Sequence, residues 1–331
     1  MQLLYLFEKI RNPVFDFFFS AVTYLGDEIA LMLIAITLFW CVNKRAGYYM
    51  LASGFFGILA NQTMKLAFKI PRPWERDPSF TIVESAREAA SGYSFPSGHS
   101  QNAVSTFGAV FLTANKKVVK ILCIVAAILV PVSRMYLGVH TLWDVLAGSA
   151  CAVVILLILE EIFKSDKLFD KWVPFIVGLL TLGTVAFFLY AVVFAPESTD
   201  PNALSAAKNA KTLLGCSAGL ILVYPLDRFV IKFDTKSTWY GHIIKFVGGF
   251  VIVLLLKELL RDPFEALFGD YGRAIRYFVI VAFGGALWPL TFKYIAKLKV
   301  PVLDRFGERV AAFFANIFAR KNRVTEADKS E

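Results

Sequence analysis

The sequence predicts an all-α polytopic membrane protein with about nine transmembrane helices, and three observations lead to this fold class. Of its 331 residues, 57% are hydrophobic and only 18% are charged, which is too apolar for a soluble domain of this length. Apolar stretches of roughly 20 residues recur along the chain, and each is long enough to cross a bilayer core of ~30 Å as a helix. Basic residues gather in the short links between alternate stretches, as the positive-inside rule describes.

The apolar pattern also divides the chain into four parts. Residues 1–27 alternate apolar residues with charged ones at helical spacing, which is typical of an amphipathic helix lying in the membrane interface. We expect a transmembrane core over 28–163, additional transmembrane helices over 164–299, and an amphipathic tail over 300–331 on the cytoplasmic membrane surface. The predicted transmembrane helices cover residues 28–43, 46–67, 99–115, 118–138, 142–163, 172–194, 208–226, 240–260 and 272–296.

The charges of the links predict how the chain is oriented in the membrane. One membrane face carries most of the basic residues, so we expect it to be cytoplasmic. The net charge of +9 follows from this orientation, and no basic stripe or aromatic-basic module indicates a nucleic-acid partner. The basic links contain Lys44, Arg45, Lys116, Lys117, Lys120, Lys164, Lys167, Lys171, Arg228, Lys232 and Lys236.

The opposite, non-cytoplasmic face is expected to hold an unusual set of polar residues. A phosphate ester is dianionic, and its transition state spreads charge over three oxygens that need fixed donors. Lys65, Arg72 and Arg134 supply such donors, since arginine binds phosphate in a bidentate way and lysine acts as a point charge. The residues that the topology brings to this face are Lys65, Arg72, His99, Arg134, His140 and Asp144.

The segment from Ser94 to Ser100 adds hydroxyls and backbone N–H groups at a helix N-terminus. A helix N-terminus favours an anion, Ser97 adds a hydroxyl there, and Gly98 allows the backbone to approach it closely. We expect Asp144, four residues after His140, to accept a hydrogen bond from one imidazole nitrogen and leave the other free to attack phosphorus.

His99 then remains as the general acid for the departing alkoxide and as the base that activates water on phosphohistidine. No metal or other cofactor is expected, because this face lacks the cluster of carboxylates that a magnesium site needs. The four cysteines fall within apolar stretches without metal-like spacing, and we interpret them as core residues.

Three segments resemble the signature motifs of the type 2 phosphatidic acid phosphatase superfamily. These segments are Lys65-Leu-Ala-Phe-Lys-Ile-Pro-Arg72-Pro73, Pro96-Ser97-Gly98-His99 and Ser133-Arg134 with His140 and Asp144. That superfamily includes lipid phosphate phosphatases, glucose-6-phosphatase and the vanadium haloperoxidases. The resemblance covers residues 28–163 and implies a six-helix catalytic core. It assigns His140 as nucleophile, Asp144 as its partner, His99 as acid, and Lys65, Arg72, Ser97, Gly98 and Arg134 as phosphate ligands.

The resemblance therefore implies a metal-independent membrane phosphatase that forms a phosphohistidine. Its expected partners are membrane lipids and a lipid phosphate or pyrophosphate substrate, such as undecaprenyl pyrophosphate, phosphatidic acid, phosphatidylglycerophosphate or a sphingoid-base phosphate. Alternatives are a sugar-phosphate phosphatase similar to glucose-6-phosphatase, a haloperoxidase and a non-enzymatic lipid transporter. Compact outer links without glycosylation acceptors favour a bacterial inner membrane, with the active site on the non-cytoplasmic face. We expect the links 195–207 and 261–271 to cap the site and select the substrate.

Overall fold

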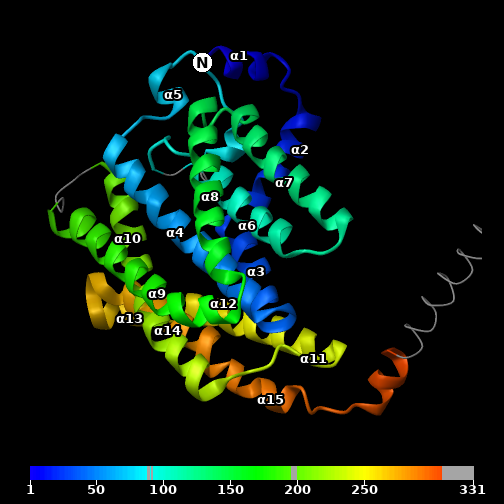
Figure 1. Ribbon diagram of the computed structural model, residues 1–331. Helices are drawn as coiled ribbons and strands as arrows, with labels where there is room; N and C mark the ends of the chain where they lie inside the picture. Colours follow the sequence, from blue (N-terminus) through cyan, green and yellow to red (C-terminus); the bar gives the residue numbers. More distant parts are fainter. Residues whose placement is uncertain (88–89, 91, 195–199, 308–331) are drawn as a thin grey trace, which may run out of the picture.

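The computed structural model describes residues 1–87, 90, 92–194 and 200–307, and this part of the chain is a helical bundle without β-strands (Figure 1). The all-α polytopic class is thus confirmed. Short π-helical turns prolong α3 to Val42, α9 to Phe194 and α10 to Ile231. The helices are α1 Gln2–Lys9, α2 Pro13–Thr23, α3 Glu28–Thr37, α4 Lys44–Phe68, α5 Pro73–Arg76, α6 Gly98–Thr113, α7 Lys117–Tyr136, α8 Leu142–Phe163, α9 Asp166–Phe188, α10 Pro201–Pro225, α11 Trp239–Ile243, α12 Gly249–Leu259, α13 Arg261–Phe268, α14 Gly272–Ala282 and α15 Phe292–Ile295.

Six helical segments of the described chain are long and apolar enough to cross a membrane, and the protein is an integral membrane protein. A bent pair, Pro13–Gly26 with Glu28–Val42, adds a seventh crossing if its two halves, inclined at 51°, form one span. The six segments are Lys117–Tyr136, Leu142–Phe163, Asp166–Val193, Pro201–Ile231, Trp239–Leu259 and Arg261–Ile295.

The expected spans 46–67 and 99–115 are also helical, but they are more polar than the six segments above. These are α4 and α6, and α6 has only 16 residues. Neighbouring helices enclose α6, which contacts α3, α4, α7 and α8. Polar groups within a membrane bundle lie in its interior, so these two helices carry polar side chains where the apolar helices shield them from lipid. The buried polar residues of α6 include Ser100, Gln101, Ser105 and Thr106.

The expectation of one continuous helix over residues 1–27 is wrong, because the chain forms two helices there, and the position of this segment in the membrane interface stays a prediction. The side chain of Asn12 accepts hydrogen bonds from the N–H groups of Val14 and Phe15, and Pro13 occupies the first turn of α2. Both features favour the start of a new helix. α1 buries Leu4 in a cluster with Phe80, while α2 packs against α7. The N-terminal segment therefore covers the end of the bundle near α5.

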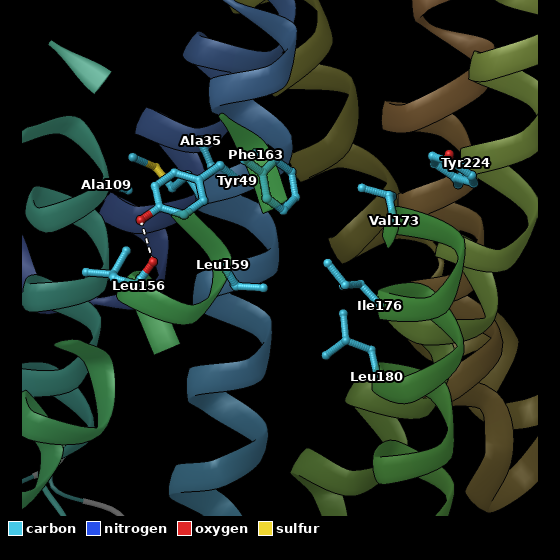
Figure 2. Packing of buried hydrophobic residues seen from close by; sticks show 11 residues of the cluster. Ala35, Tyr49, Ala109, Leu156, Leu159, Phe163, Val173, Ile176, Leu180 and Tyr224 are labelled. Atoms are coloured by element: carbon cyan, nitrogen blue, oxygen red, sulfur yellow. Dashed lines mark hydrogen bonds between the residues drawn. The ribbon is translucent and has the colours of Figure 1, made fainter. Parts of the chain in front are cut away.

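The main apolar core joins the first and second halves of the chain. Leu156 and Phe163 of α8 lie in one cluster with Ile176 and Leu180 of α9 (Figure 2). The hydroxyl of Tyr49 in α4 donates to the carbonyl of Leu156 at 3.0 Å, so the two helices are also fixed along their length (Figure 2). Consequently α9, the first helix after residue 163, shares the core of the preceding helices.

The basic links gather at the end of the bundle opposite α1 and α5 (Figure 1). There, Lys44 pairs with Asp227 at 2.5 Å and Arg45 with Asp166 at 3.0 Å, which brings the starts of α4 and α9 close to the end of α10. The expected tail begins at this end, where the Tyr240 hydroxyl donates to Leu298 O at 2.9 Å and residues 301–307 are helical. Residues 308–331 of that tail lie outside the described chain.

Gly148 of α8 tests how tightly α8 packs against the start of α6. A Cβ atom at Gly148 would lie 2.5 Å from the carbonyl oxygen of Ser97, whereas a Cβ at Gly178 of α9 would meet nothing within 4 Å. We expect Gly148→Ala to lower the free energy of unfolding by about 1–3 kcal/mol through overpacking. Gly178→Ala, the matched control, should leave it unchanged or raise it by up to about 1 kcal/mol. Thermal unfolding in detergent checks this, and equal stability of the two variants would contradict the close packing.

Candidate active site

The ends of four long helices and two connecting links bring the expected site residues together at the α1 and α5 end of the bundle (Figure 1). Lys65 lies in the last turn of α4 and Arg134 in the last turn of α7. Arg72 precedes α5, and His140 precedes α8. Most of these side chains are buried although they are charged or polar. Burying such groups is unfavourable unless other polar groups surround them. The buried members are Lys65, Arg72, Ser97, Arg134, His140 and Asp144.

The guanidinium group of Arg72 contacts the imidazole of His140 directly. Its Nη1 lies 2.9 Å from Nε2 of His140 and also donates to the carbonyl of Val139 at 3.0 Å. Its Nε donates to the carbonyl of Gly92 at 3.0 Å. Arginine can only donate, so Nε2 accepts, and the proton of a neutral imidazole must reside on Nδ1. The lone pair of Nε2 therefore points toward the cationic group.

Asp144 holds three segments of the site together. Its Oδ2 accepts from the Ser94 hydroxyl at 2.7 Å and from the Thr141 N–H at 2.7 Å, while its backbone carbonyl accepts from the Ser97 N–H at 2.9 Å. Nδ1 of His140 lies 3.6 Å from Oδ2, which is longer than a hydrogen bond. The expected hydrogen bond between these residues is thus not made, because the carboxylate also caps the N-terminus of α8.

Positive charge dominates the interior of this site. Arg134 is fully buried, and its Nη1 donates to the hydroxyl of Thr23 at 2.8 Å. Within the described residues, its Nε and Nη2 have no partner, and the ammonium group of Lys65 forms neither an ion pair nor a hydrogen bond. Uncompensated buried cations are unfavourable, so the arrangement favours binding of an anion. Arg72, Arg134 and Lys65 all act on His140, and the carboxylate of Asp144, 3.6 Å from Nδ1, is a single negative charge beside these three cations.

The electrostatics of the site also determine the protonation of its central residues. Burial, followed by the positive charges of Arg72 and Arg134, lowers the pKa of His140 well below its usual value. Burial lowers the pKa of Arg72 to about 10, so its guanidinium remains charged at neutral pH. His140 is therefore a neutral imidazole beside fixed cations, the form in which histidine acts as a nucleophile.

The turn before α6 supplies backbone donors. The Ser97 hydroxyl caps α6 by accepting from the Ser100 N–H at 3.4 Å, and it also accepts from the Ser100 hydroxyl at 2.9 Å. Gly98 is the first residue of the helix. The amide of Asn61 in α4 donates to the carbonyl of Pro96 at 3.3 Å and fixes the turn. Since the first N–H groups of a helix have no partner within it, this turn presents donors to an anion.

Two contacts, that of Thr23 with Arg134 and that of Ser94 with Asp144, became apparent only in the structure. Thr23 lies in the segment expected to rest on the membrane surface, and no local pattern connects it with Arg134. Ser94 stands beside the signature motif, but its bond to Asp144 crosses 50 positions of sequence. The third histidine, His242, lies in α11 at the opposite end of the bundle (Figure 1).

The two links expected to cap the site differ in position. Asp200 accepts a hydrogen bond from the Tyr93 hydroxyl, so the start of α10 reaches the link that precedes α6. Residues 195–199 lie outside the described chain. In the other link, Asp270 pairs with Lys211 at 3.5 Å and the ring of Tyr271 lies 6.4 Å from that of Phe188. This ion pair and this ring contact join the link to α10 and α9.

Comparison with known proteins places the chain in a family. Residues 44–168 match the PAP2 superfamily, and residues 211–299 match the PAP2 superfamily phosphatase transmembrane extension. The chain belongs to the PAP2 superfamily, and its class is that of a membrane phosphatase. The resemblance seen in the motifs of the first half is confirmed, and the second match extends it to a region where the motifs gave no support.

Several curated proteins are similar to parts of the chain. Phosphatidylglycerophosphatase B of Bacillus subtilis is 28% identical over 174 residues, which cover 49% of this chain and 82% of that protein. Undecaprenyl-diphosphatase BcrC of the same species is 30% identical over 147 residues, covering 44% of this chain and 73% of the relative. Human sphingosine-1-phosphate phosphatase 2 is 20% identical over 277 residues, which cover 76% of this chain and 66% of that protein. No solved structure matches the chain.

The contact between Arg134 and Thr23 predicts a measurable effect on anion binding. In Thr23→Val, the guanidinium loses an acceptor that holds it in place, and a hydrogen bond to a charged group contributes about 1.5–3 kcal/mol. We expect the inhibition constant of inorganic phosphate, measured by competition, to rise about tenfold. Thr37→Val is the matched control, because that hydroxyl donates only to Leu33 O of its own helix. The same constant in both variants would show that Thr23 does not position Arg134.

Proposed function

We propose that this protein is a metal-independent phosphatase of lipid phosphates or pyrophosphates that works through a phosphohistidine at His140. The observation that carries the proposal is the neutral imidazole of His140, whose Nε2 lies 2.9 Å from the guanidinium of Arg72 among buried cations. A nucleophile beside fixed positive groups is what transfer of an anionic phosphoryl group requires.

Substrate phosphate would be held by the cations that surround His140. Lys65, Arg72 and Arg134 bind its oxygens, the Ser97 hydroxyl adds a side-chain donor, and the N–H group of Gly98 adds a backbone donor. These groups are fixed by protein contacts before substrate arrives, so little reorganisation is needed as charge moves onto the transferring oxygens. The side chains come from α4, α7 and the link before α6, which makes the site depend on the packing of the bundle.

The reaction would proceed in two displacements. Oxygens of the bound phosphate take over the Arg72 donor, which frees the lone pair of Nε2. Nε2 of His140 then attacks phosphorus while the bond to the ester oxygen breaks, and His99, protonated beside the phosphate dianion, donates its proton to the leaving alkoxide. Asp144 stabilises the proton on Nδ1, and its distance of 3.6 Å would shorten, as catalytic hydrogen bonds often do when substrate binds. His99 then removes a proton from water, the water oxygen attacks phosphorus, the nitrogen–phosphorus bond breaks, and phosphate leaves.

The lipid substrate class is supported by the relatives and by the fold. The curated relatives described above have names that indicate action on lipid phosphates or diphosphates. The apolar helices allow a substrate with an acyl or prenyl chain to reach the site from within the bilayer. Since the basic links lie at the other end, we place the site on the non-cytoplasmic face of a bacterial inner membrane.

Replacing His140 and His242 separately tests the nucleophile. We expect His140→Ala to lose phosphate release by about 10³-fold or more, because a nucleophile is removed. His242→Ala, at the opposite end of the bundle, should keep full activity. Brief incubation with ³²P-labelled lipid phosphate should give an acid-labile, base-stable phosphoprotein in wild type and none in His140→Ala. A labelled His140→Ala protein, or one with full activity, would refute His140 as nucleophile.

A further inference from the structure

A small polar cavity adjoins the phosphate-binding cations. It has a volume of ≈ 30 Å³ and lies between α4, the link before α6 and the first turns of α10. Gly92 also lines it, and the carbonyl of Gly92 accepts from Nε of Arg72, whose Nη1 contacts His140. The cavity is therefore next to the proposed reaction centre. Its polar lining residues include Gln62, Lys65, Tyr93, Asn202, Ser205 and Asn209.

The packing of α10 fixes the direction of three of these residues. Ala206 and Ala210 are buried in a cluster with Leu59 and Leu66 of α4. On a helix, positions three, four and seven apart share a face. The neighbouring stripe, formed by Asn202, Ser205 and Asn209, consequently lines the cavity.

The start of α10 is also fastened to the catalytic link. Asp200 caps α10 by accepting from the Asn202 N–H at 2.9 Å, and it accepts from the Tyr93 hydroxyl as well. Tyr93 immediately precedes Ser94, which bonds to Asp144. The cavity and the phosphate site are therefore parts of one connected framework.

The lining determines which chemical group fits. The side chains of Gln62, Ser205 and Asn209 form no hydrogen bond with any other described residue, so their amide and hydroxyl groups are available to a ligand. No carboxylate is among the described lining residues, and the ammonium of Lys65 is beside the cavity, which disfavours a cationic amine. A volume of ≈ 30 Å³ holds about one or two water-sized groups, which is too small for a second phosphate.

We infer that this cavity receives a hydroxyl group next to the phosphate ester, so that α10 selects lipid phosphates with a glycerol-type head group. The inference rests on the proposed function and adds the residues that choose among lipid phosphates. Asn202, Ser205 and Asn209 lie outside both regions that match the PAP2 patterns, 44–168 and 211–299. This part of the site can thus differ between members of the family while the phosphate ligands stay the same.

A matched pair of substrates tests the inference. One is 1-acylglycerol 3-phosphate, and the other is 1-acyl-propane-1,3-diol 3-phosphate, which lacks only the central hydroxyl. We expect wild type to favour the hydroxylated substrate about three- to tenfold in kcat/KM, as one neutral hydrogen bond provides. Asn209→Leu and Ser205→Ala should each reduce this ratio towards one by slowing only the hydroxylated substrate. Lys208→Gln, an exposed position on the same helix, should keep the wild-type ratio.

The outcomes separate the inference from the proposed function. Equal rates with both substrates in wild type, or a wild-type ratio in both Asn209→Leu and Ser205→Ala, would overturn the hydroxyl site while leaving the phosphatase intact. Absence of phosphate release from both substrates by folded wild-type protein would contradict the proposed function and, with it, the inference. Thermal unfolding of each variant ensures that the comparison is made on folded protein.

Discussion

The burial of three positive side chains at one end of a membrane bundle is the constraint on which the rest of the structure depends. Lys65, Arg72 and Arg134 repel one another and lose hydration, so the fold must hold them in place by other contacts. Carbonyl oxygens of Gly92 and Val139 accept from Arg72, and Thr23 accepts from Arg134. These neutral acceptors orient the cations without neutralising them, which preserves their affinity for an anion.

Asp144 links this charge cluster to the helices. Its carboxylate and backbone carbonyl join the link before α6, the turn at Ser97 and the N-terminus of α8. Gly148, one turn further along α8, lets the helix lie against Ser97. A carboxylate that must cap a helix and stand beside His140 cannot optimise both contacts at once, and this explains the distance of 3.6 Å. Substrate binding would change this balance, since it adds negative charge at Nε2.

The sequence was sufficient for the features that depend on local pattern. Hydropathy predicted the helical segments, and the topology drawn from them predicted that Lys65, Arg72, Arg134, His140 and Asp144 share one end of the bundle. It did not predict the break at Asn12, because the charged residues around it fit one amphipathic helix. Nor could it pair Thr23 with Arg134, since that contact joins residues 111 positions apart and follows from packing of α2 on α7. The approach of α10 to Lys65 is likewise a tertiary property, produced by the apolar contact of α10 with α4.

The central claim, that a neutral His140 attacks phosphorus within a preformed cluster of cations, is tested most directly by a structure with bound vanadate. Vanadate mimics the geometry of transferring phosphate, and metal-free protein should bind it. The account predicts a vanadium–nitrogen bond to Nε2 of His140, with vanadate oxygens contacting Lys65, Arg72 and Arg134. Vanadate bonded to His99, or held away from these three cations, would contradict it.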